Sequence, residues 1–463
     1  MTKNIFSFIV ISLLAINFSF SQLSKAKKFA KSISAEELSE HLYTYASDEF
    51  EGRDTGKEGQ KKAVEYLRNY YKSIGVEAGD PDGDYFQSMS LKIRGRRGKP
   101  GTTVDTENVI AIIKGSEKPE EYVILSAHLD HVGIDKDGEI YNGADDDGSG
   151  TVALLEIAQA FKKAKDKGKG PKRSVVFLHV TGEEKGLLGS KYYTENPIYP
   201  LENTVVNLNV DMIGRIDPTR EAKNRDYIYL IGSNHDSNDL HNLSEETNTA
   251  TVNMTLDYRF NDKNDPNRFY YRSDHYNFAK NGIPIIFYFT GTHEDYHKIT
   301  DTPDKIEYDL LEMRSKLIFY TAWNIANRDR RLIVDPKPEK IAVSLDQLKE
   351  YTGVYSNVQG GEMKIIEVKG NLAMVPAGRS NDEAMVLDAV GDHKFKMTMA
   401  GINIEFLDKK MKFKMGEREI IFDLIPPPPS PDKTPEPMRV ELGVNDKDPK
   451  APPPPPPPPP KNK

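Results

Sequence analysis

The stretch NGADDDGSG, residues 142–150, places three consecutive aspartates between glycines. Adjacent ionised carboxylates repel one another, so either water solvates all three or a cation lies among them. A polar turn that leads into a helix is the commoner reason for an Asp-rich run, because aspartate favours turns and helix N-caps. The choice between a turn and a metal site depends on the other side chains that the fold brings close.

Several histidine and acidic residues come shortly after apolar runs. The runs are YVILSA, SVVFLHVTG, NLNV and IPIIFYFTGT, and each reads as a buried strand. In open α/β sheets, ligands bind in the crevice beyond the carboxyl ends of the strands. We therefore expect one edge of the sheet to gather the side chains that follow these runs, which are His128, Asp130, Glu183, Glu184, Asp211 and His297.

These residue types suit a pair of metal ions. Two zinc ions about 3.5–4 Å apart need a shared carboxylate, with histidine and acidic ligands on either side. The chain has no cysteine, which excludes thiolate ligands and disulfides. In a Glu183-Glu184 pair, one carboxylate can bind metal while its neighbour stays free as a general base.

A calcium loop is the competing interpretation of the acidic run. Asp145, Asp147, Ser149, Gly150 and Glu156 match the spacing of an EF-hand loop. An EF-hand also needs an amphipathic helix that enters the loop, whereas the preceding residues read KDGEIYNGA. We therefore favour the two-metal site.

The pattern of apolar residues predicts two domains. Buried runs that alternate with helical stretches predict an α/β domain with a mostly parallel central sheet flanked by helices, over residues 22–333. A linker follows at 334–340. Alternation with a period of two then predicts a small antiparallel β domain over 341–425. The tail at 426–463 is rich in proline and is predicted to be disordered.

The first 21 residues have the features of a signal peptide. Lys3 precedes an apolar run at 5–20, and small residues follow near Ser21. We expect export to the periplasm or the extracellular space, with an uncleaved anchor as the alternative. No later segment is apolar and long enough to cross a membrane. A net charge of −8 without a basic cluster argues against nucleic-acid binding.

Six motifs together resemble the co-catalytic zinc aminopeptidases of peptidase clan MH, a family that also includes glutamate carboxypeptidases and, more distantly, glutaminyl cyclases. They occur in the family's order and are HLDHVG, NGADDDGSG, TGEEKGLLGS, NVDMIG, SDHYNF and DYHKITDTPDKI. The resemblance implies the zinc-peptidase fold, two Zn²⁺ ions per chain and an exopeptidase that acts on peptides. Within that class, the preferred activity is that of an aminopeptidase.

The resemblance also implies a ligand set. Asp146 would bridge both metals, His128 and Asp211 would complete one site, and Glu184 and His297 the other. His275 is the main alternative to His297, and His293 is a further one. We expect His131 and His179 to be packing or loop residues, and manganese or cobalt could replace zinc on the same ligands.

Further residues receive roles next to the metals. Glu183 would take a proton from a water that bridges the metals and later pass it to the leaving amine. The Asp130 carboxylate would orient the His128 ring. Tyr270, or its neighbour Tyr271, would stabilise the tetrahedral intermediate.

Three other functions remain open. A carboxypeptidase would need a basic residue for the terminal carboxylate of its substrate, and Arg215 and Arg272 lie near the motifs. A glutaminyl cyclase would use one metal only, although residues for two are present. A non-catalytic binding protein would act through the β domain and the proline tail, and would have no use for Glu183.

Overall fold

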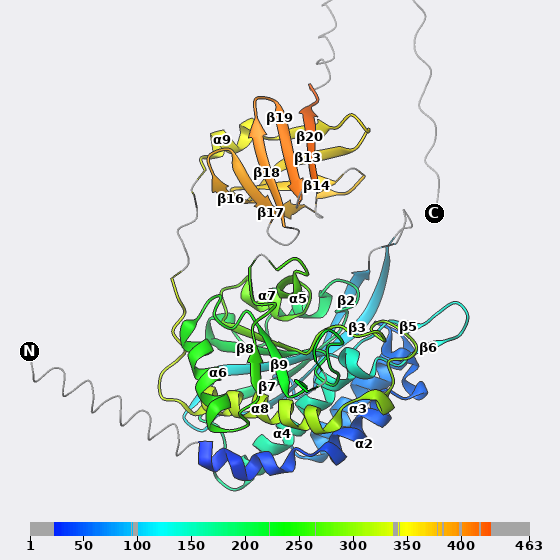
Figure 1. The fold of residues 1–463 in the computed structure, drawn as a ribbon, viewed down its shortest axis with the longest axis vertical. Coiled ribbons are helices and arrows are strands. Elements are labelled where there is room, and N and C mark those ends of the chain that lie inside the picture. The colour runs from blue at the N-terminus through cyan, green and yellow to red at the C-terminus, as the bar shows by residue number, and fades with distance from the viewer. Residues whose placement is uncertain are drawn as a thin grey trace, which may run out of the picture. The chain divides into compact units, whose positions relative to one another are not determined.

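The computed structural model describes residues 23–426 except 94, 96–100, 222, 264, 337–340, 342, 377, 382–383, 398–400 and 416–417. The predicted signal peptide and almost all of the predicted tail lie outside these residues. The chain divides into two compact units, residues 1–339 and 340–463 (Figure 1). Within the described part of the chain, no helix has both the length and the apolar character that crossing a membrane requires.

The first unit contains a nine-stranded mixed sheet. The strand order is β1-β3-β7-β4-β8-β11-β9-β10, and β2 pairs with β3. The central strands β7, β4, β8 and β11 are parallel, whereas β3 and β9 run antiparallel to their neighbours β7 and β11. The bounds are β1 Glu77–Ala78, β2 Phe86–Ile93, β3 Thr102–Ile113, β4 Lys118–His128, β7 Arg173–Val180, β8 Thr204–Val210, β9 Tyr227–Ile231, β10 Thr255–Asp257 and β11 Ile285–Phe289.

The predicted α/β class is confirmed, but the sheet is parallel only at its centre. Four residues, 114–117, join β3 to β4. Such a short connection reverses the chain, because parallel neighbours need a crossover of a dozen or more residues. Strand β3 therefore runs against β4, and β7 lies between them.

Helices cover both faces of this sheet (Figure 1). Alternate residues of β4 serve two cores: Val123 and Leu125 pack into the core on the side of α2, α3, α4 and α8, and Ile124 packs into the core that includes Phe278 of α7. The bounds are α2 Ala35–Tyr45, α3 Glu58–Ser73, α4 Gly150–Asp166, α5 Leu188–Glu195, α6 Asn238–Ala250, α7 His275–Ala279 and α8 Tyr308–Asn327.

The second unit is an antiparallel sheet with a core of its own. Its strands follow the order β15-β14-β13-β12-β20-β19-β18-β17-β16, and alternate side chains such as Ile404, Met411 and Phe413 fill the core. The predicted antiparallel β domain is confirmed. The bounds are α9 Leu345–Glu350, β12 Gly353–Ser356, β13 Glu362–Val368, β14 Asn371–Pro376, β15 Met385–Val386, β16 Asp388–Gly391, β17 Lys394–Met397, β18 Ile402–Leu407, β19 Lys410–Met415 and β20 Arg418–Leu424.

Candidate metal centre

The parallel strands bring the predicted ligands to one edge of the sheet. His128 is the last residue of β4, Asp211 directly follows β8, and Glu184 follows β7 after a short turn. His297 lies beyond the end of β11. Asp146 belongs to the turn Ala144–Ser149 that precedes α4. Because β4, β7, β8 and β11 point the same way, their carboxyl ends share this edge.

Asp146 lies between two groups of side chains. Its Oδ1 is 3.1 Å from His128 Nε2, and its Oδ2 is 3.0 Å from His297 Nε2. His128 Nε2 is also 3.6 Å from Asp211 Oδ1, and His297 Nε2 is 2.9 Å from Glu184 Oε1. All five predicted ligands therefore meet in the described structure, and their role in binding metal stays a prediction.

Two buried carboxylate oxygens of the cluster are available to bind a cation. Asp146 Oδ2 and Glu184 Oε1 are buried and have no hydrogen-bond partner among the described residues. Their contacts with His297 are short but not aligned as hydrogen bonds. Ligand atoms 2.0–2.2 Å from one tetrahedral ion lie about 3.3–3.6 Å apart, and the separations in this cluster are 2.9–3.6 Å. Each side of Asp146 therefore has the atoms that a cation requires.

The electrostatics of the cluster favour positive charge. Burial alone would lower the pKa of His128, but the carboxylates of Asp211 and Asp146 hold that pKa well above its usual range. Burial also opposes protonation of His297, yet Asp146 and Glu184 raise its pKa to about 10. Metal binding requires the neutral imidazoles, so a cation would replace these protons.

Glu183 lies beside the cluster without belonging to it. It lines a small pocket together with Asp146 and Asp211. Loss of solvent raises the pKa of its carboxyl group well above the usual range, His128 opposes the shift and the charge of Glu184 adds to it. A carboxyl group that readily holds a proton next to the ligands can act as a general base and acid.

Asp130 differs from the prediction. His128 Nδ1 is 3.0 Å from the backbone carbonyl oxygen of Asp130 and 4.0 Å from its carboxylate, so the carbonyl orients the ring. The carboxylate instead accepts hydrogen bonds from the backbone N–H of Glu183 at 3.1 Å and from Thr55 Oγ1 at 2.7 Å. The side chain of Asp130 therefore positions Glu183, which corrects the role expected for it.

Asp145 and Asp147, the outer two aspartates of the run, accept hydrogen bonds from backbone N–H groups. Asp147 accepts hydrogen bonds from the N–H groups of His128, Gly150 and Met212, at 3.1, 2.9 and 3.2 Å. Asp145 accepts one from the N–H of Gly214 at 2.6 Å. Both therefore bind backbone N–H groups of the turn and of the chain around it, whereas the carboxylate of Asp146 lies 3.1 Å from the ring nitrogen of His128 and 3.0 Å from that of His297.

The two alternatives to His297 are engaged elsewhere. His293 Nε2 is 3.1 Å from Asp145 Oδ2. His275 Nε2 is 2.8 Å from the carbonyl oxygen of Tyr270, and its ring stacks on Phe287. Neither histidine has a described contact with Asp146 or Glu184, so the geometry favours His297.

Two residues near the ligands were not predicted. Tyr296 lines the pocket beside Glu183, and its ring stacks on His297 with centroids 4.0 Å apart. Tyr270, the predicted catalytic tyrosine, packs against His235 and Tyr276 and does not line this pocket. His131 Nδ1 lies 3.1 Å from Glu184 Oε1, although the sequence indicated a packing residue. In the sequence, the one indication of Tyr296 was that it precedes His297, and the one indication of His131 was that it follows Asp130.

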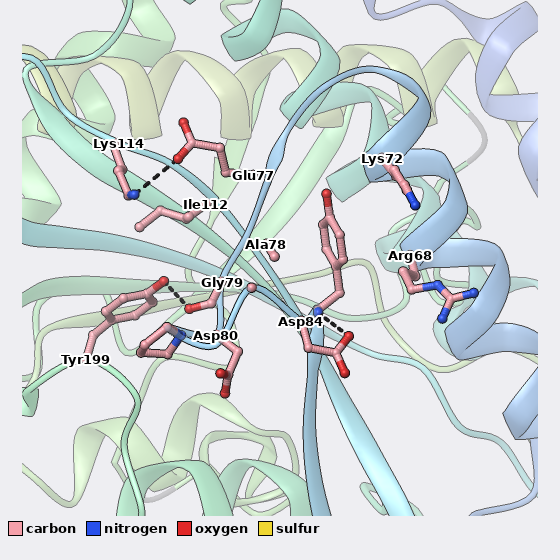
Figure 2. A pocket seen from close by; sticks show the side chains of 13 residues that line it. Arg68, Lys72, Glu77, Ala78, Gly79, Asp80, Asp84, Ile112, Lys114 and Tyr199 are labelled. Carbon is pink, nitrogen blue, oxygen red and sulfur yellow. Dashed lines mark hydrogen bonds and ion pairs between the residues drawn. The ribbon is translucent and has the colours of Figure 1, made fainter.

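Another pocket lies away from this candidate centre. It has a volume of about 850 Å³ and lies between the end of α3, strand β1 and the part of β3 that pairs with the amino end of β7. Figure 2 shows that its charges are mixed, and Lys114 Nζ lies 3.2 Å from Glu77 Oε2. None of the predicted ligands lines it. The candidate metal centre is therefore at the opposite edge of the sheet.

A known protein family matches the segment that contains this candidate centre. Residues 108–322 match the family model described as peptidase family M28. This segment is therefore similar to peptidase family M28. It contains Glu183 and all five predicted ligands, so the family resemblance seen in the motifs is confirmed.

Two curated relatives of this M28 segment differ in their described activities. The chain is 30% identical to aminopeptidase Y of Saccharomyces cerevisiae over 237 residues, which cover 48% of this chain and 40% of that protein. It is 40% identical to the probable glutamate carboxypeptidase LAMP1 of Arabidopsis thaliana over 106 residues, 23% of this chain and 14% of the relative. The matches thus span less than half of either relative.

Solved structures share the fold. An aminopeptidase from Aneurinibacillus sp. strain AM-1 superposes with a TM-score of 0.50 at 17% identity, over 68% of this chain and 98% of that chain. LapB from Legionella pneumophila gives a TM-score of 0.51 at 20% identity, over 65% and 75% of the two chains. At these identities the likeness concerns the α/β architecture.

Proposed function

We propose that this chain is an exported di-zinc metallo-exopeptidase that removes N-terminal residues from peptides. One observation carries the proposal: Asp146 lies between a His128–Asp211 group and a Glu184–His297 group, with Glu183 beside them. This arrangement is located in a segment that is similar to peptidase family M28. Export rests on the signal peptide predicted for residues 1–21.

The ligands divide between two zinc ions. Asp146, His128 and Asp211 would hold one ion, and Asp146, Glu184 and His297 the other. When bound, two such ions polarise the scissile carbonyl and make water a stronger acid at neutral pH.

The chain's own groups handle the proton and the charge of the intermediate. Glu183 takes the proton of the attacking water and passes it to the leaving amine, which suits a carboxyl group whose pKa desolvation has raised. Tyr270 is the tyrosine that the sequence predicts for the tetrahedral intermediate. In the structure, Tyr296 is better placed to stabilise this intermediate, because it lines the pocket and stacks on His297.

A carboxypeptidase is the second candidate, and one residue favours it. Arg272 lines the pocket beside Asp211 and Glu183, where a guanidinium group could receive a terminal carboxylate. Arg215, the other basic residue considered, lies 3.0 Å from Asp295 Oδ2 and 3.4 Å from Glu294 Oε1. The carboxypeptidase reading therefore depends on Arg272 alone.

The test uses residues 22–463 and peptides with free or acetylated N-termini, analysed by mass spectrometry. We expect N-terminal residues to be released from free peptides only, and a chelator or the substitution Glu183→Ala to abolish release. Trimming from the C-terminus would contradict the proposal in favour of a carboxypeptidase. Binding of peptides without cleavage, with zinc present, would favour a binding protein.

A further inference from the structure

His131 is the one buried histidine at the metal centre that the expected ligand set leaves out. Its ring is fully buried, and neither ring nitrogen has a hydrogen-bond partner among the described residues. A buried polar group without a partner loses its hydration and gains nothing in return. The position therefore needs an explanation that packing does not provide.

Backbone hydrogen bonds and close packing against Gly143 fix the position of His131. The backbone N–H of His131 donates a hydrogen bond to the carbonyl oxygen of Arg53 at 3.2 Å. The Arg53 guanidinium in turn donates to the carbonyl oxygens of Asn142 and Gly143 at 2.7 and 2.8 Å. A Cβ atom at Gly143 would lie 2.5 Å from the His131 ring, so this glycine makes room for it. The segments that carry His131 and Asp146 are thus fixed against each other.

The Nδ1 atom of His131 faces the same two oxygens as His297. It lies 3.1 Å from Glu184 Oε1 and 3.7 Å from Asp146 Oδ2, and His297 Nε2 lies 2.9 and 3.0 Å from these atoms. Both oxygens are themselves buried without a hydrogen-bond partner in the described structure. Short contacts that are not aligned as hydrogen bonds are what atoms around a common ion show.

We propose that His131 Nδ1 binds directly the same cation as Glu184 and His297. The inference rests on the di-zinc function proposed above. Counting Asp146, that cation would have four protein ligands, the number usual in structural zinc sites.

The first test counts imidazoles in the wild-type protein, residues 22–463, loaded with two equivalents of Zn²⁺. X-ray absorption at the zinc edge is expected to fit three imidazoles shared by two ions. Two imidazoles over two ions would overturn the proposal. Because this measurement needs no variant, it decides the matter even if a substitution at His131 prevents folding.

The second test measures zinc affinity by competition with a chelating dye. We expect His131→Gln to weaken one of the two binding steps by more than about 100-fold, because loss of an outer-shell partner alone costs about 10- to 100-fold. His179→Gln is the matched control, since His179 is equally buried and its Nε2 is 2.7 Å from the hydroxyl of Tyr71 instead. Equal affinities in the His131 variant and the control would overturn the proposal.

Neither measurement contains a substrate. A protein with three imidazoles on two zinc ions and no turnover would refute the exopeptidase and leave the ligand in place. An active exopeptidase with two imidazoles on its zinc ions would refute the proposed His131 ligand and leave the exopeptidase in place.

Discussion

Glu183 and Glu184 are neighbours in the sequence that meet different surroundings. Glu184 Oε1 faces His297 and His131, at 2.9 and 3.1 Å. Glu183 lines the pocket, and its backbone N–H is tied to Asp130. The two carboxylates are therefore suited to separate tasks, one as a ligand and the other as the carrier of a proton.

Replacing Glu183 by glutamine tests its role as the proton carrier. The amide keeps the size of the side chain but cannot take a proton, so we expect kcat to fall by about 100- to 10,000-fold. Zinc content should stay at the wild-type level, because Glu183 is outside the ligand set. The exposed Glu195 of α5 provides a control, since Glu195→Gln should leave kcat unchanged. A variant that loses zinc together with activity would place Glu183 among the ligands.

The carboxylate of Asp130 supports a separate prediction. Asp130→Ala removes the acceptor of the Glu183 N–H and of the Thr55 hydroxyl. We expect a fall in kcat of about 10- to 100-fold, as for other supporting groups around metal sites. Steady-state kinetics and zinc titration of the same samples provide the measurement. Lower zinc affinity with unchanged kcat would support the original expectation that this carboxylate orients His128.

At the residue scale, the sequence was sufficient to predict the site residues that lie in motifs at fixed positions relative to a strand. Asp146, Glu184 and His297 could be named because each lies in a motif whose position relative to a strand is visible in the sequence. The Asp130 carbonyl could not be distinguished from its carboxylate, since both belong to one residue. His131 and Tyr296 were missed because the direction of a side chain in a loop depends on tertiary contacts.

Helix α4 carries a buried carboxyl group on its face toward α2. Glu156 Oε1 accepts a hydrogen bond from Gln159 at 2.9 Å and lies 3.7 Å from His41 Nε2, and Oε2 has no hydrogen-bond partner among the described residues. Burial, followed by the nearby charge of Glu37, raises the pKa of Glu156 to about 8. The folded state therefore favours the protonated form.

This shift predicts how stability depends on pH. Because the folded pKa exceeds the unfolded one, the contribution of Glu156 is complete below about pH 4.5 and is lost as the pH rises toward about 8, by at most about 1.4 kcal/mol per pH unit. Glu156→Gln should remove this slope and make the protein more stable than wild type above pH 8. Denaturant unfolding of both proteins between pH 5 and 9 measures how the free energy of unfolding depends on pH. Parallel curves for the two proteins would contradict the shift.

At the element scale, long periodic segments could be predicted and strand directions could not. Apolar residues recur with a helical period over 57–75, where α3 lies, and they alternate with polar residues after residue 394, where β17 to β20 lie. Apolar runs mark buried strands, but they do not show which way a strand runs. The antiparallel placement of β3 and β9 depends on pairings between distant residues, which a single sequence does not display.

At the scale of the whole molecule, the two units have separate hydrophobic cores. The residues that pack in the β domain, such as Tyr355, Phe395 and Phe422, belong to a different cluster from those of the first unit. The predicted ligands and Glu183 all lie within residues 1–339. The first unit therefore contains every group that the proposed reaction needs.

A chain of residues 22–339 is expected to fold and to keep kcat/KM within about twofold of the full chain, as for domains with their own cores. Peptide hydrolysis and thermal unfolding of the two proteins, compared at equal concentration, provide the measurement. Loss of activity in a truncated chain that still folds would show that the β domain contributes to catalysis or substrate binding.

The central claim, that Asp146 joins two zinc sites that together catalyse hydrolysis, is tested most directly by zinc titration. Metal-free protein would be titrated with Zn²⁺ while hydrolysis of a peptide with a free N-terminus is followed. The account predicts that activity rises to a plateau at two equivalents of zinc per chain and that Asp146→Asn abolishes it. A plateau at one equivalent, or activity that does not respond to zinc, would contradict it.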